Sequence, residues 1–195
     1  MTRQRYTLAT SLLLAILAML GGQAVSASAE KRPNILFFLT DDQPQIGLGC
    51  MGNRHIRTPN MDALAAEGVL FTNAFVTTSI CSCNRASILT GQTMRRHGIR
   101  DFQRPLSAEA LAQTYPLLLR QAGYRTGYLG KFAIGWPNAD IRHLSLPADR
   151  FDFWYGFPQT IDFRQTENGQ VRYLTTVMTE KAIEFLRQNP ADRPF

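Results

Sequence analysis

The sequence predicts an α/β fold, with helices on both faces of a mostly parallel central sheet. Residues 34–39 form an apolar run that ends in Thr40-Asp41-Asp42, which is typical of a strand buried on both faces. A helical pattern over residues 114–122 is followed directly by a strand pattern over residues 125–129. Because strands and helices alternate and no internal repeat appears, we expect a three-layer αβα sandwich.

The first 29 residues have the pattern of an export signal. Arg3 and Arg5 precede an apolar run over residues 8–20, and Ala27-Ser28-Ala29 matches a signal-peptidase site, so we expect cleavage after Ala29. The run is shorter than the ~20 residues that a membrane-spanning helix needs. We therefore expect no stable membrane span, with an uncleaved anchor as the alternative. The prediction is an exported protein, periplasmic or extracellular, with residues 1–29 as signal peptide.

The elements after the first strand are predicted from their caps and patterns. A helix over residues 61–67 follows Thr58-Pro59-Asn60, and residues 69–76 have strand character. A short helix over residues 84–90 is ended by Gly91, which places Cys81 just before its N-terminus. The helix over residues 114–122 has Pro116 in its first turn, where proline is favoured.

The last third of the sequence predicts a core-packing segment, one helix and the beginning of a further strand. Residues 151–157, FDFWYGF, are interpreted mainly as core packing, with a sugar-stacking surface as the alternative. Residues 174–188 form an amphipathic helix that Asn189-Pro190 ends. Arg193-Pro194-Phe195 then resembles the approach to another strand. We expect residues 30–195 to form one domain that is incomplete at its C-terminus.

Charge and cysteine content exclude some classes of protein. Without Arg3 and Arg5, Lys+Arg falls from 21 to 19 against 15 acidic residues, and no run of five or six basic residues occurs. No nucleic-acid partner is therefore expected. Three cysteines do not make a disulfide framework. Cys50 is interpreted as a small buried side chain.

Three polar clusters follow apolar elements and carry chemistry together. The adjacent carboxylates of Asp41 and Asp42 can bind a hard divalent cation. Cys81 at a helix N-terminus faces free N–H groups, and Arg85 lies one turn further on. Lys131 supplies a point charge at a strand end. Each cluster alone is ordinary, since paired Asp residues often make turns and isolated cysteines are often inert. Their order and spacing favour a site for sulfuryl or phosphoryl transfer.

The stretch TTSICSCNRASILTGQ, from Thr77 to Gln92, resembles the sulfatase signature C-x-P-S-R-x-x-x-L-T-G. RPNILFFLTDDQ, RTPNMDALAAEGVLFTNAF and YRTGYLGKF resemble further sulfatase segments, in order, over much of residues 32–135. The chain is thus similar to the N-terminal portion of a formylglycine-dependent sulfatase. The resemblance implies an alkaline-phosphatase-like fold.

The resemblance also implies roles for the clustered residues. Asp41 and Asp42 would be Ca²⁺ ligands, and formylglycine made from Cys81 would be both nucleophile and ligand. Arg85 would hold the formylglycine hydrate and Lys131 would bind the sulfate. One hydroxyl of the hydrate would attack sulfur, and the other would help to expel sulfate afterwards. The implied partners are a formylglycine-generating enzyme and a sulfated small-molecule or polysaccharide substrate, with sulfated carbohydrate favoured.

This chain departs from the family pattern at several positions. Cys83 stands where the family has Pro, Asn84 where it has Ser, and Ala133 where it has His. His97, the histidine closest in sequence to Cys81, is a hypothetical substitute, with a helix-end histidine preferred. The family's other metal and sulfate ligands lie beyond Phe195. We therefore expect residues 30–195 alone neither to hold calcium tightly nor to turn over.

Two alternatives remain beside the sulfatase. A phosphomonoester or phosphonate hydrolase of the same superfamily could use the same metal and nucleophile, because sulfate and phosphate esters share tetrahedral geometry. A non-catalytic sulfatase-like remnant or binding module would leave Cys81 as an unmodified thiol.

Overall fold

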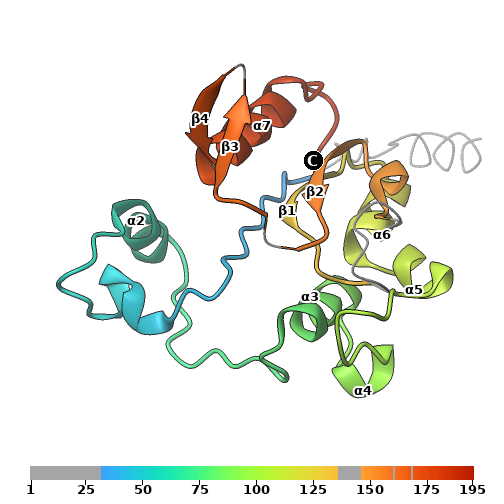
Figure 1. Ribbon diagram of the computed structural model, residues 1–195, viewed down its shortest axis with the longest axis horizontal. Helices are drawn as coiled ribbons and strands as arrows, with labels where there is room; N and C mark the ends of the chain where they lie inside the picture. The colour runs from blue at the N-terminus through green and yellow to red at the C-terminus, as the bar shows by residue number, and fades with distance from the viewer. Residues whose placement is uncertain (1–31, 136–145, 160, 168) are drawn as a thin grey trace, which may run out of the picture. The chain divides into compact units, whose positions relative to one another are not determined.

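Two parallel strands lie at the centre of the fold, in a computed structural model that describes residues 32–135, 146–159, 161–167 and 169–195 (Figure 1). β1 (Gly127–Lys131) and β2 (Phe153–Phe157) pair in register from Gly127↔Phe153 to Lys131↔Phe157. The pairing continues beyond the strands, because the Phe132 and Ala133 amides donate to the carbonyls of Phe157 and Pro158. The predicted signal peptide lies outside the described residues.

The last residues of the chain, which the sequence predicted as the approach to another strand, run beside the start of β1. The Arg125 amide donates to the Pro194 carbonyl at 2.8 Å, and the Ile35 amide donates to the Phe195 carbonyl at 2.6 Å. Residues 193–195 therefore connect the start of β1 to the extended segment that begins near Asn34. This arrangement places the carboxyl ends of the central segments at one edge, where open α/β sheets carry their sites.

Helices cover both faces of the paired strands. On one face, the helix α7 (Leu174–Arg187) packs so closely that a Cβ on Gly127 would lie 2.9 Å from the Phe185 ring. On the other face, Ala86 and Leu89 of α3 (Cys81–Thr90) form a buried cluster with Ile99, Phe132 and Ile134. Residues that alternate along a strand point to opposite faces, so the helices and sheet make three layers. The predicted αβα sandwich is confirmed.

Most aromatic side chains of residues 151–157 fill the interior. The rings of Trp154 and Tyr128 stack with centroids 5.0 Å apart, and Phe151 lies 5.2 Å from Trp154. Phe153 points to the opposite face, where it packs 5.6 Å from Phe185 of α7. Core packing is therefore the correct interpretation for these three positions, 151, 153 and 154.

The predicted helices form, with small shifts at their ends. α3 begins at Cys81 rather than at Asn84, because the Asn84 amide already donates to the Ile80 carbonyl at 2.8 Å. It ends where predicted, at Gly91 in the left-handed conformation. The other helical elements are η1 (Gln45–Gly47), η2 (Gly49–Met51), α2 (Pro59–Glu67), α4 (Met94–His97), α5 (Ala108–Ala112), α6 (Tyr115–Gln121) and η4 (Ala148–Arg150).

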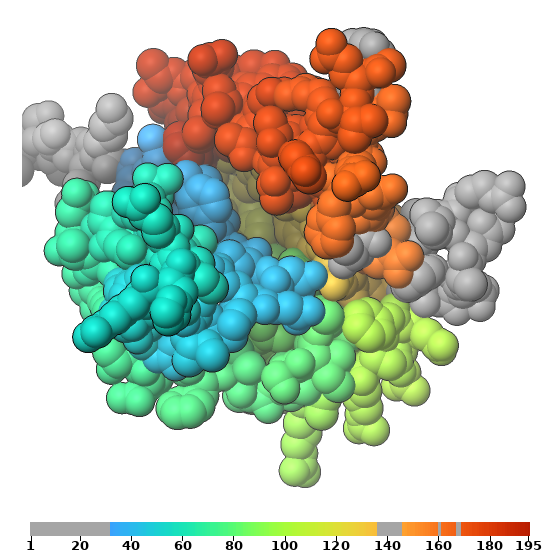
Figure 2. All heavy atoms as spheres, turned by 60° about the vertical axis from the view of Figure 1, so that its left-hand side comes forward, coloured from blue at the N-terminus to red at the C-terminus, as the bar shows by residue number. Residues whose placement is uncertain are grey.

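Two predicted strands are wrong. Residues 34–39 and 69–76 are not strands, and their side chains are exposed, with Phe38 at 74 % and Phe75 at 89 %. In Figure 2 the atoms of the first segment, in blue, are visible at the surface. A strand needs a partner for its backbone groups, and within the described ranges residues 34–39 have a single such backbone bond, to Phe195.

One hairpin was not predicted. β3 (Arg164–Glu167) and β4 (Gln170–Tyr173) pair antiparallel, with Arg164 opposite Tyr173. Their sequences are polar and lack the apolar alternation that signals a strand. The Leu174 amide donates to the Phe163 carbonyl at 2.7 Å, which joins the hairpin to the start of α7.

Across the described ranges, every helix is too short or too polar to cross a membrane.

Candidate active site

The first turn of α3 presents Cys81 together with free backbone donors. Cys81 is the first residue of the helix, and the first intrahelical bond is that from Asn84 to Ile80. The amides of Cys81, Ser82 and Cys83 therefore have no acceptor within the helix. With the positive end of the helix dipole, such amides suit an anion next to the sulfur.

Lys131 brings the three predicted clusters together at the end of β1. Its Nζ lies 2.9 Å from Asp41 Oδ2 and 3.6 Å from Cys81 Sγ. These residues come from segments 90 and 50 positions away in sequence. Asp41 and Cys81 thus both lie within contact distance of Lys131, and the order of the clusters in the chain led us to expect this grouping.

Arg85 fixes this arrangement from the second turn of α3. Its guanidinium is nearly buried and donates from Nη1 to the Lys131 carbonyl at 2.7 Å. Nη2 reaches Asp41 Oδ1 at 3.4 Å. Arg85 therefore orients both Asp41 and the backbone that carries Lys131, and it lines the same cavity as Cys81.

Tyr128 is a site residue that sequence reasoning missed. Its hydroxyl donates to the Lys131 carbonyl at 2.8 Å, so this carbonyl accepts two hydrogen bonds. Burial raises the pKa of Tyr128 to about 12, and the nearby Arg85 charge opposes this only in part. Tyr128 is therefore a neutral donor at physiological pH. Tyr128 lies three residues before Lys131 in a strand pattern. This position indicated a core residue and not a site residue.

The two acidic residues have different surroundings. Partial burial alone would raise the pKa of Asp41, but the hydrogen bond and charge of Lys131, with help from Arg85, hold it below the ordinary value. Asp42 is exposed and has a left-handed backbone, with φ 55°. Within the described part of the chain, no side-chain bond is formed by Asp42. It is thus the more available carboxylate.

A cavity of about 270 Å³ is lined by several of these groups, although Lys131 and Tyr128 are not among its lining residues. Its lining includes both carboxylates, the sulfur and the guanidinium, together with the Asn84 amide. The remaining lining residues are Leu39, Thr40, Gln43, Val76, Ser79 and Ile80. A hollow lined by both charged and apolar side chains is suited to hold a charged group attached to a larger organic body.

The cavity residues include oxygen ligands of the type that calcium binds, but fewer of them than a complete calcium site needs. Asp41, Asp42 and the amides of Gln43 and Asn84 are oxygen donors of the type that Ca²⁺ prefers. Calcium takes about 6–8 oxygen ligands. Among the residues that the structure describes, no three His, Cys, Asp or Glu side chains are gathered to hold a metal. These residues therefore supply part of a coordination shell.

Two of the three departures from the family pattern, at positions 83 and 133, are compatible with the local structure. Cys83 is fully buried in the first turn of α3, where a helix tolerates proline and other residues alike. Ala133 is buried with φ 58°, and its amide bonds to the Pro158 carbonyl, so no imidazole reaches the site from there. Nothing in the structure explains the choice of Asn84 beyond its place in the cavity wall.

His97 does not substitute for the missing imidazole. Its Nε2 lies 3.0 Å from Ser87 Oγ, and its Nδ1 accepts a hydrogen bond from the Ile99 amide at 3.1 Å. Both ring nitrogens are thus engaged away from Cys81. The preferred interpretation, a helix-end histidine with a structural role, agrees with its place at the end of α4. His55 is exposed, and His143 lies outside the described residues.

Comparisons with known proteins agree with this geometry. The profile of the Sulfatase family matches residues 33–195. The N-acetylglucosamine-6-O-sulfatase of Bacteroides thetaiotaomicron is 33% identical over 196 residues, which cover 95% of this chain and 33% of that protein. Arylsulfatase D of Homo sapiens is 37% identical over 142 residues, covering 67% of this chain and 24% of that protein.

A further relative and a solved structure extend the comparison. An ulvan-active sulfatase of Formosa agariphila is 32% identical over 152 residues, covering 73% of this chain and 28% of that protein. The structure of BT4656 with its substrate D-glucosamine-2-N,6-O-disulfate superimposes with a TM-score of 0.68 at 35% identity, covering 85% of this chain and 33% of that one. The chain thus spans about a third or less of these relatives' lengths. Since the family profile matches most of the sequence and the fold agrees, the chain belongs to the sulfatase family.

Proposed function

We propose that this chain carries the nucleophile side of a sulfatase that hydrolyses sulfate monoesters. The observation that carries the proposal is the meeting of Cys81, Lys131 and Asp41 at the N-terminus of α3, within 2.9–3.6 Å of Lys131 Nζ. A sulfate ester has one negative charge, which the free helix amides and the Lys131 ammonium are placed to balance. The attacking group and the anion-binding groups are thus adjacent.

Each residue has a defined task in this proposal. Lys131 Nζ binds a sulfate oxygen and stabilises charge that develops as the ester bond breaks. Arg85 holds Asp41 and the Lys131 carbonyl, so the ammonium is directed at the position of Cys81. Tyr128 donates a second hydrogen bond to the same carbonyl.

Two groups are proposed to complete the site. Formylglycine, made from Cys81 by a formylglycine-generating enzyme, would supply a hydrated aldehyde as nucleophile. Ca²⁺, held in part by Asp41, Asp42 and residue 81, would supply a positive charge next to the sulfate. Residue 83 lies in the first turn of α3, where a helix accepts either cysteine or proline. The helix that carries residue 81 therefore forms with Cys83 in place of proline.

A sulfated carbohydrate is the proposed substrate class, acted on outside the cytoplasm. The relatives' names support this class, since they include an N-acetylglucosamine-6-O-sulfatase and an ulvan-active sulfatase. The solved relative holds a disulfated glucosamine. The proposed export rests on the basic start, apolar run and A-x-A site of residues 1–29.

Hydrolysis of 4-nitrophenyl sulfate by the protein as its host produces it tests the proposal. Cys81→Ala should reduce the rate to the uncatalysed background, because no other residue can replace the nucleophile. Cys50→Ala, which changes a cysteine outside the cavity, should leave the rate unchanged. Faster hydrolysis of 4-nitrophenyl phosphate would indicate a phosphomonoester hydrolase instead. Absence of turnover on both esters, with a free thiol at Cys81, would indicate a non-catalytic relative.

A further inference from the structure

The cavity beside Cys81 includes a side-chain amide, that of Asn84, to which the hydrolysis of a simple sulfate ester gives no task. We propose that Asn84 determines specificity by binding a substrate hydroxyl group next to the sulfate ester. The site would then prefer the sulfate ester of a sugar or another polyol to the same ester on a ring without hydroxyl groups. This inference rests on the proposed function, because it places the ester sulfur at residue 81.

The helix α3 presents Asn84 on the same face as Cys81 and Arg85. Residues three and four positions apart are neighbours on a helix surface, and Asn84 and Arg85 follow Cys81 by three and four positions. All three residues line the one cavity. Another row of α3 faces the core, where Ala86 and Leu89 are buried in the apolar cluster. Asn84 is half-buried and belongs to the row that faces the cavity.

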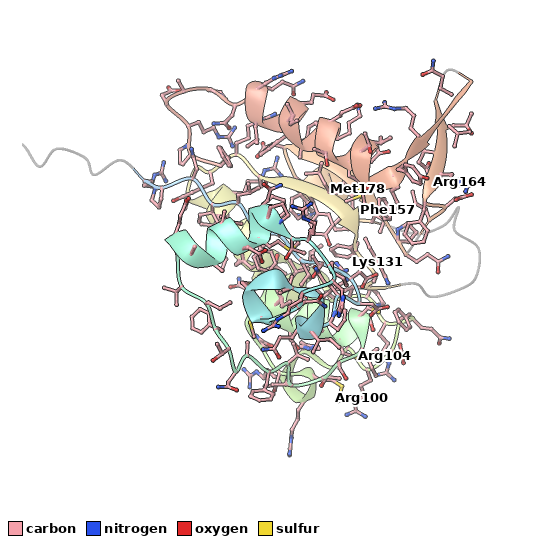
Figure 3. The ribbon with its side chains drawn as sticks, turned by 90° about the vertical axis from the view of Figure 1, so that its left-hand side faces the viewer. Arg100, Arg104, Lys131, Phe157, Arg164 and Met178 are labelled. Atoms are coloured by element: carbon pink, nitrogen blue, oxygen red, sulfur yellow. The ribbon has the colours of Figure 1, made fainter. Side chains whose placement is uncertain are left out.

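The groups proposed to bind the sulfate lie beside this face of the helix. Lys131 Nζ is 3.6 Å from Cys81 Sγ, and Figure 3 shows Lys131 near the end of β1. The guanidinium of Arg85 is already bonded to Asp41 and to the Lys131 carbonyl. The sulfate is thus supplied with a cation and with the free amides of the first turn. Asn84 is left to contact the organic part of the ester.

The side chain of Asn84 has no hydrogen-bond partner among the residues that the structure describes. Two other small polar residues of α3 do have one, since Ser87 Oγ donates to the Cys83 carbonyl at 2.9 Å and Thr90 Oγ1 to the Ala86 carbonyl at 2.6 Å. Asparagine is a poor helix former, because its amide competes with the backbone for hydrogen bonds. No contact within the described chain therefore accounts for asparagine here, and its polar groups remain available to a ligand.

The chemistry of an uncharged amide fits a hydroxyl group better than it fits the sulfate. The amide of Asn84 has two N–H donors and a carbonyl acceptor, and a hydroxyl group can both accept and donate a hydrogen bond. A site that bonds a substrate hydroxyl discriminates against an analogue without it, because the buried polar group is then left unpaired. Serine, which the family has at this position, offers one hydroxyl on a shorter side chain.

A binding cycle on the protein produced in its native host tests this role. The two probes are glucose 6-sulfate and cyclohexylmethyl sulfate, which carry the same primary sulfate ester on a six-membered ring with and without hydroxyl groups. Every protein in the cycle carries Cys81→Ala, so that neither probe is hydrolysed during calorimetry. Asn84→Ala should weaken the binding of glucose 6-sulfate about tenfold and that of cyclohexylmethyl sulfate by less than about twofold.

Two further variants separate hydrogen bonding from shape and from a general effect on the helix. Asn84→Leu keeps the size of the side chain but removes its polar groups, and it should give the same selective loss. Both alanine and leucine are better helix formers than asparagine, so α3 is retained in these variants. Asn60→Ala changes an exposed asparagine of α2 outside the cavity and should leave the binding of both probes unchanged.

The outcomes distinguish this inference from the proposed function. Equal weakening of both probes, or no weakening of either, would contradict the binding of a hydroxyl group by Asn84. Equal weakening that excess calcium reverses would identify Asn84 as a metal ligand instead. Absence of 4-nitrophenyl sulfate turnover in the protein with Cys81 intact would count against the proposed function alone, since the binding cycle needs no turnover.

Discussion

At the scale of single residues, the Lys131 carbonyl organises the candidate site. This carbonyl accepts hydrogen bonds from Arg85 and Tyr128. The side chain of Lys131 reaches Asp41 and Cys81. A carbonyl with two donors is held in one orientation more firmly than a carbonyl with one donor. The direction of the Lys131 ammonium therefore depends on Arg85, which lines the cavity, and on Tyr128, which is not among the lining residues.

Tyr128→Phe tests this dependence. The change removes one donor but leaves the carbonyl bonded to Arg85, so no buried acceptor is orphaned. We expect a loss of roughly 1 kcal/mol in the free energy of unfolding. Urea denaturation measures this loss, and the slope of the free energy of unfolding against urea concentration should not change. The sulfatase rate should also fall. Tyr155→Phe is the matched control, because the Tyr155 hydroxyl has no partner among the described residues. Equal effects of the two changes would contradict the role of Tyr128.

Sequence reasoning found the charged residues of the site but not their support. Asp41, Cys81 and Lys131 could be placed together because each follows an apolar element in an alternating α/β pattern. Tyr128 could not, since a tyrosine on a strand gives the same signal whether its hydroxyl is buried in the core or bonded to a site. Its partner is a backbone carbonyl, which carries no sequence information.

At the scale of elements, α4 contacts α3, the helix that carries Cys81. His97 at the end of α4 contacts Ser87, and the Ser87 hydroxyl donates to the Cys83 carbonyl at 2.9 Å. Because Ser87 donates its one proton to Cys83, the His97 Nε2 must carry a proton and donate to Ser87. Nδ1 then accepts from Ile99, so the folded protein selects neutral His97.

This contact predicts a pH dependence of stability. Burial lowers the pKa of His97 below its ordinary value, and the nearby Cys83 carbonyl opposes this only in part. The unfolded chain therefore binds this proton more readily than the folded chain. The contribution of His97 is complete above about pH 6.5 and is lost as pH falls through the lowered pKa.

His97→Gln isolates this contribution. A glutamine amide can still donate to Ser87 but does not titrate, so the fall in stability below about pH 6.5 should become shallower. Thermal unfolding measured between pH 5 and 8 would show this, with His55→Gln as the control at an exposed position. Parallel curves for the His97 variant and the unmodified protein would show that His97 makes no such contribution.

The elements themselves were predictable where local signals decide them. Proline in the first turn and glycine at the end marked the helices that form around Pro116 and before Gly91. Residues 34–39 and 69–76 were predicted as strands from composition, yet a strand depends on partners that composition does not specify. The pairing of β1 with β2, which are separated by 21 residues between Lys131 and Phe153, likewise could not be derived from local patterns.

At the scale of the whole molecule, exposed apolar side chains are concentrated in the first part of the described chain. The large ones include Phe38 at 74 %, Phe71 at 75 %, Val69 at 78 % and Phe75 at 89 % exposed. A surface of this kind favours association in water. Backbone groups of residues 34–39 without strand partners add to this tendency.

We therefore expect residues 33–195, prepared by themselves, to self-associate. Light scattering after gel filtration should give a mass above that of one copy, which is below the 21.9 kDa of the printed sequence. Phe38→Ser with Phe75→Ser should reduce the association, because both side chains are largely exposed and their replacement costs little packing. A monodisperse monomer without bound hydrophobic dye would contradict the exposed surface.

The proposed hydrolysis depends most on the chemical state of residue 81. The direct measurement is intact mass with peptide mapping of the protein purified from its native host. We predict that the peptide containing residue 81 shows the mass loss of thiol-to-aldehyde conversion, and that it reacts with a hydrazide probe. An unmodified thiol at Cys81 in all of the protein would contradict the formylglycine mechanism and leave a sulfatase-family chain without its nucleophile.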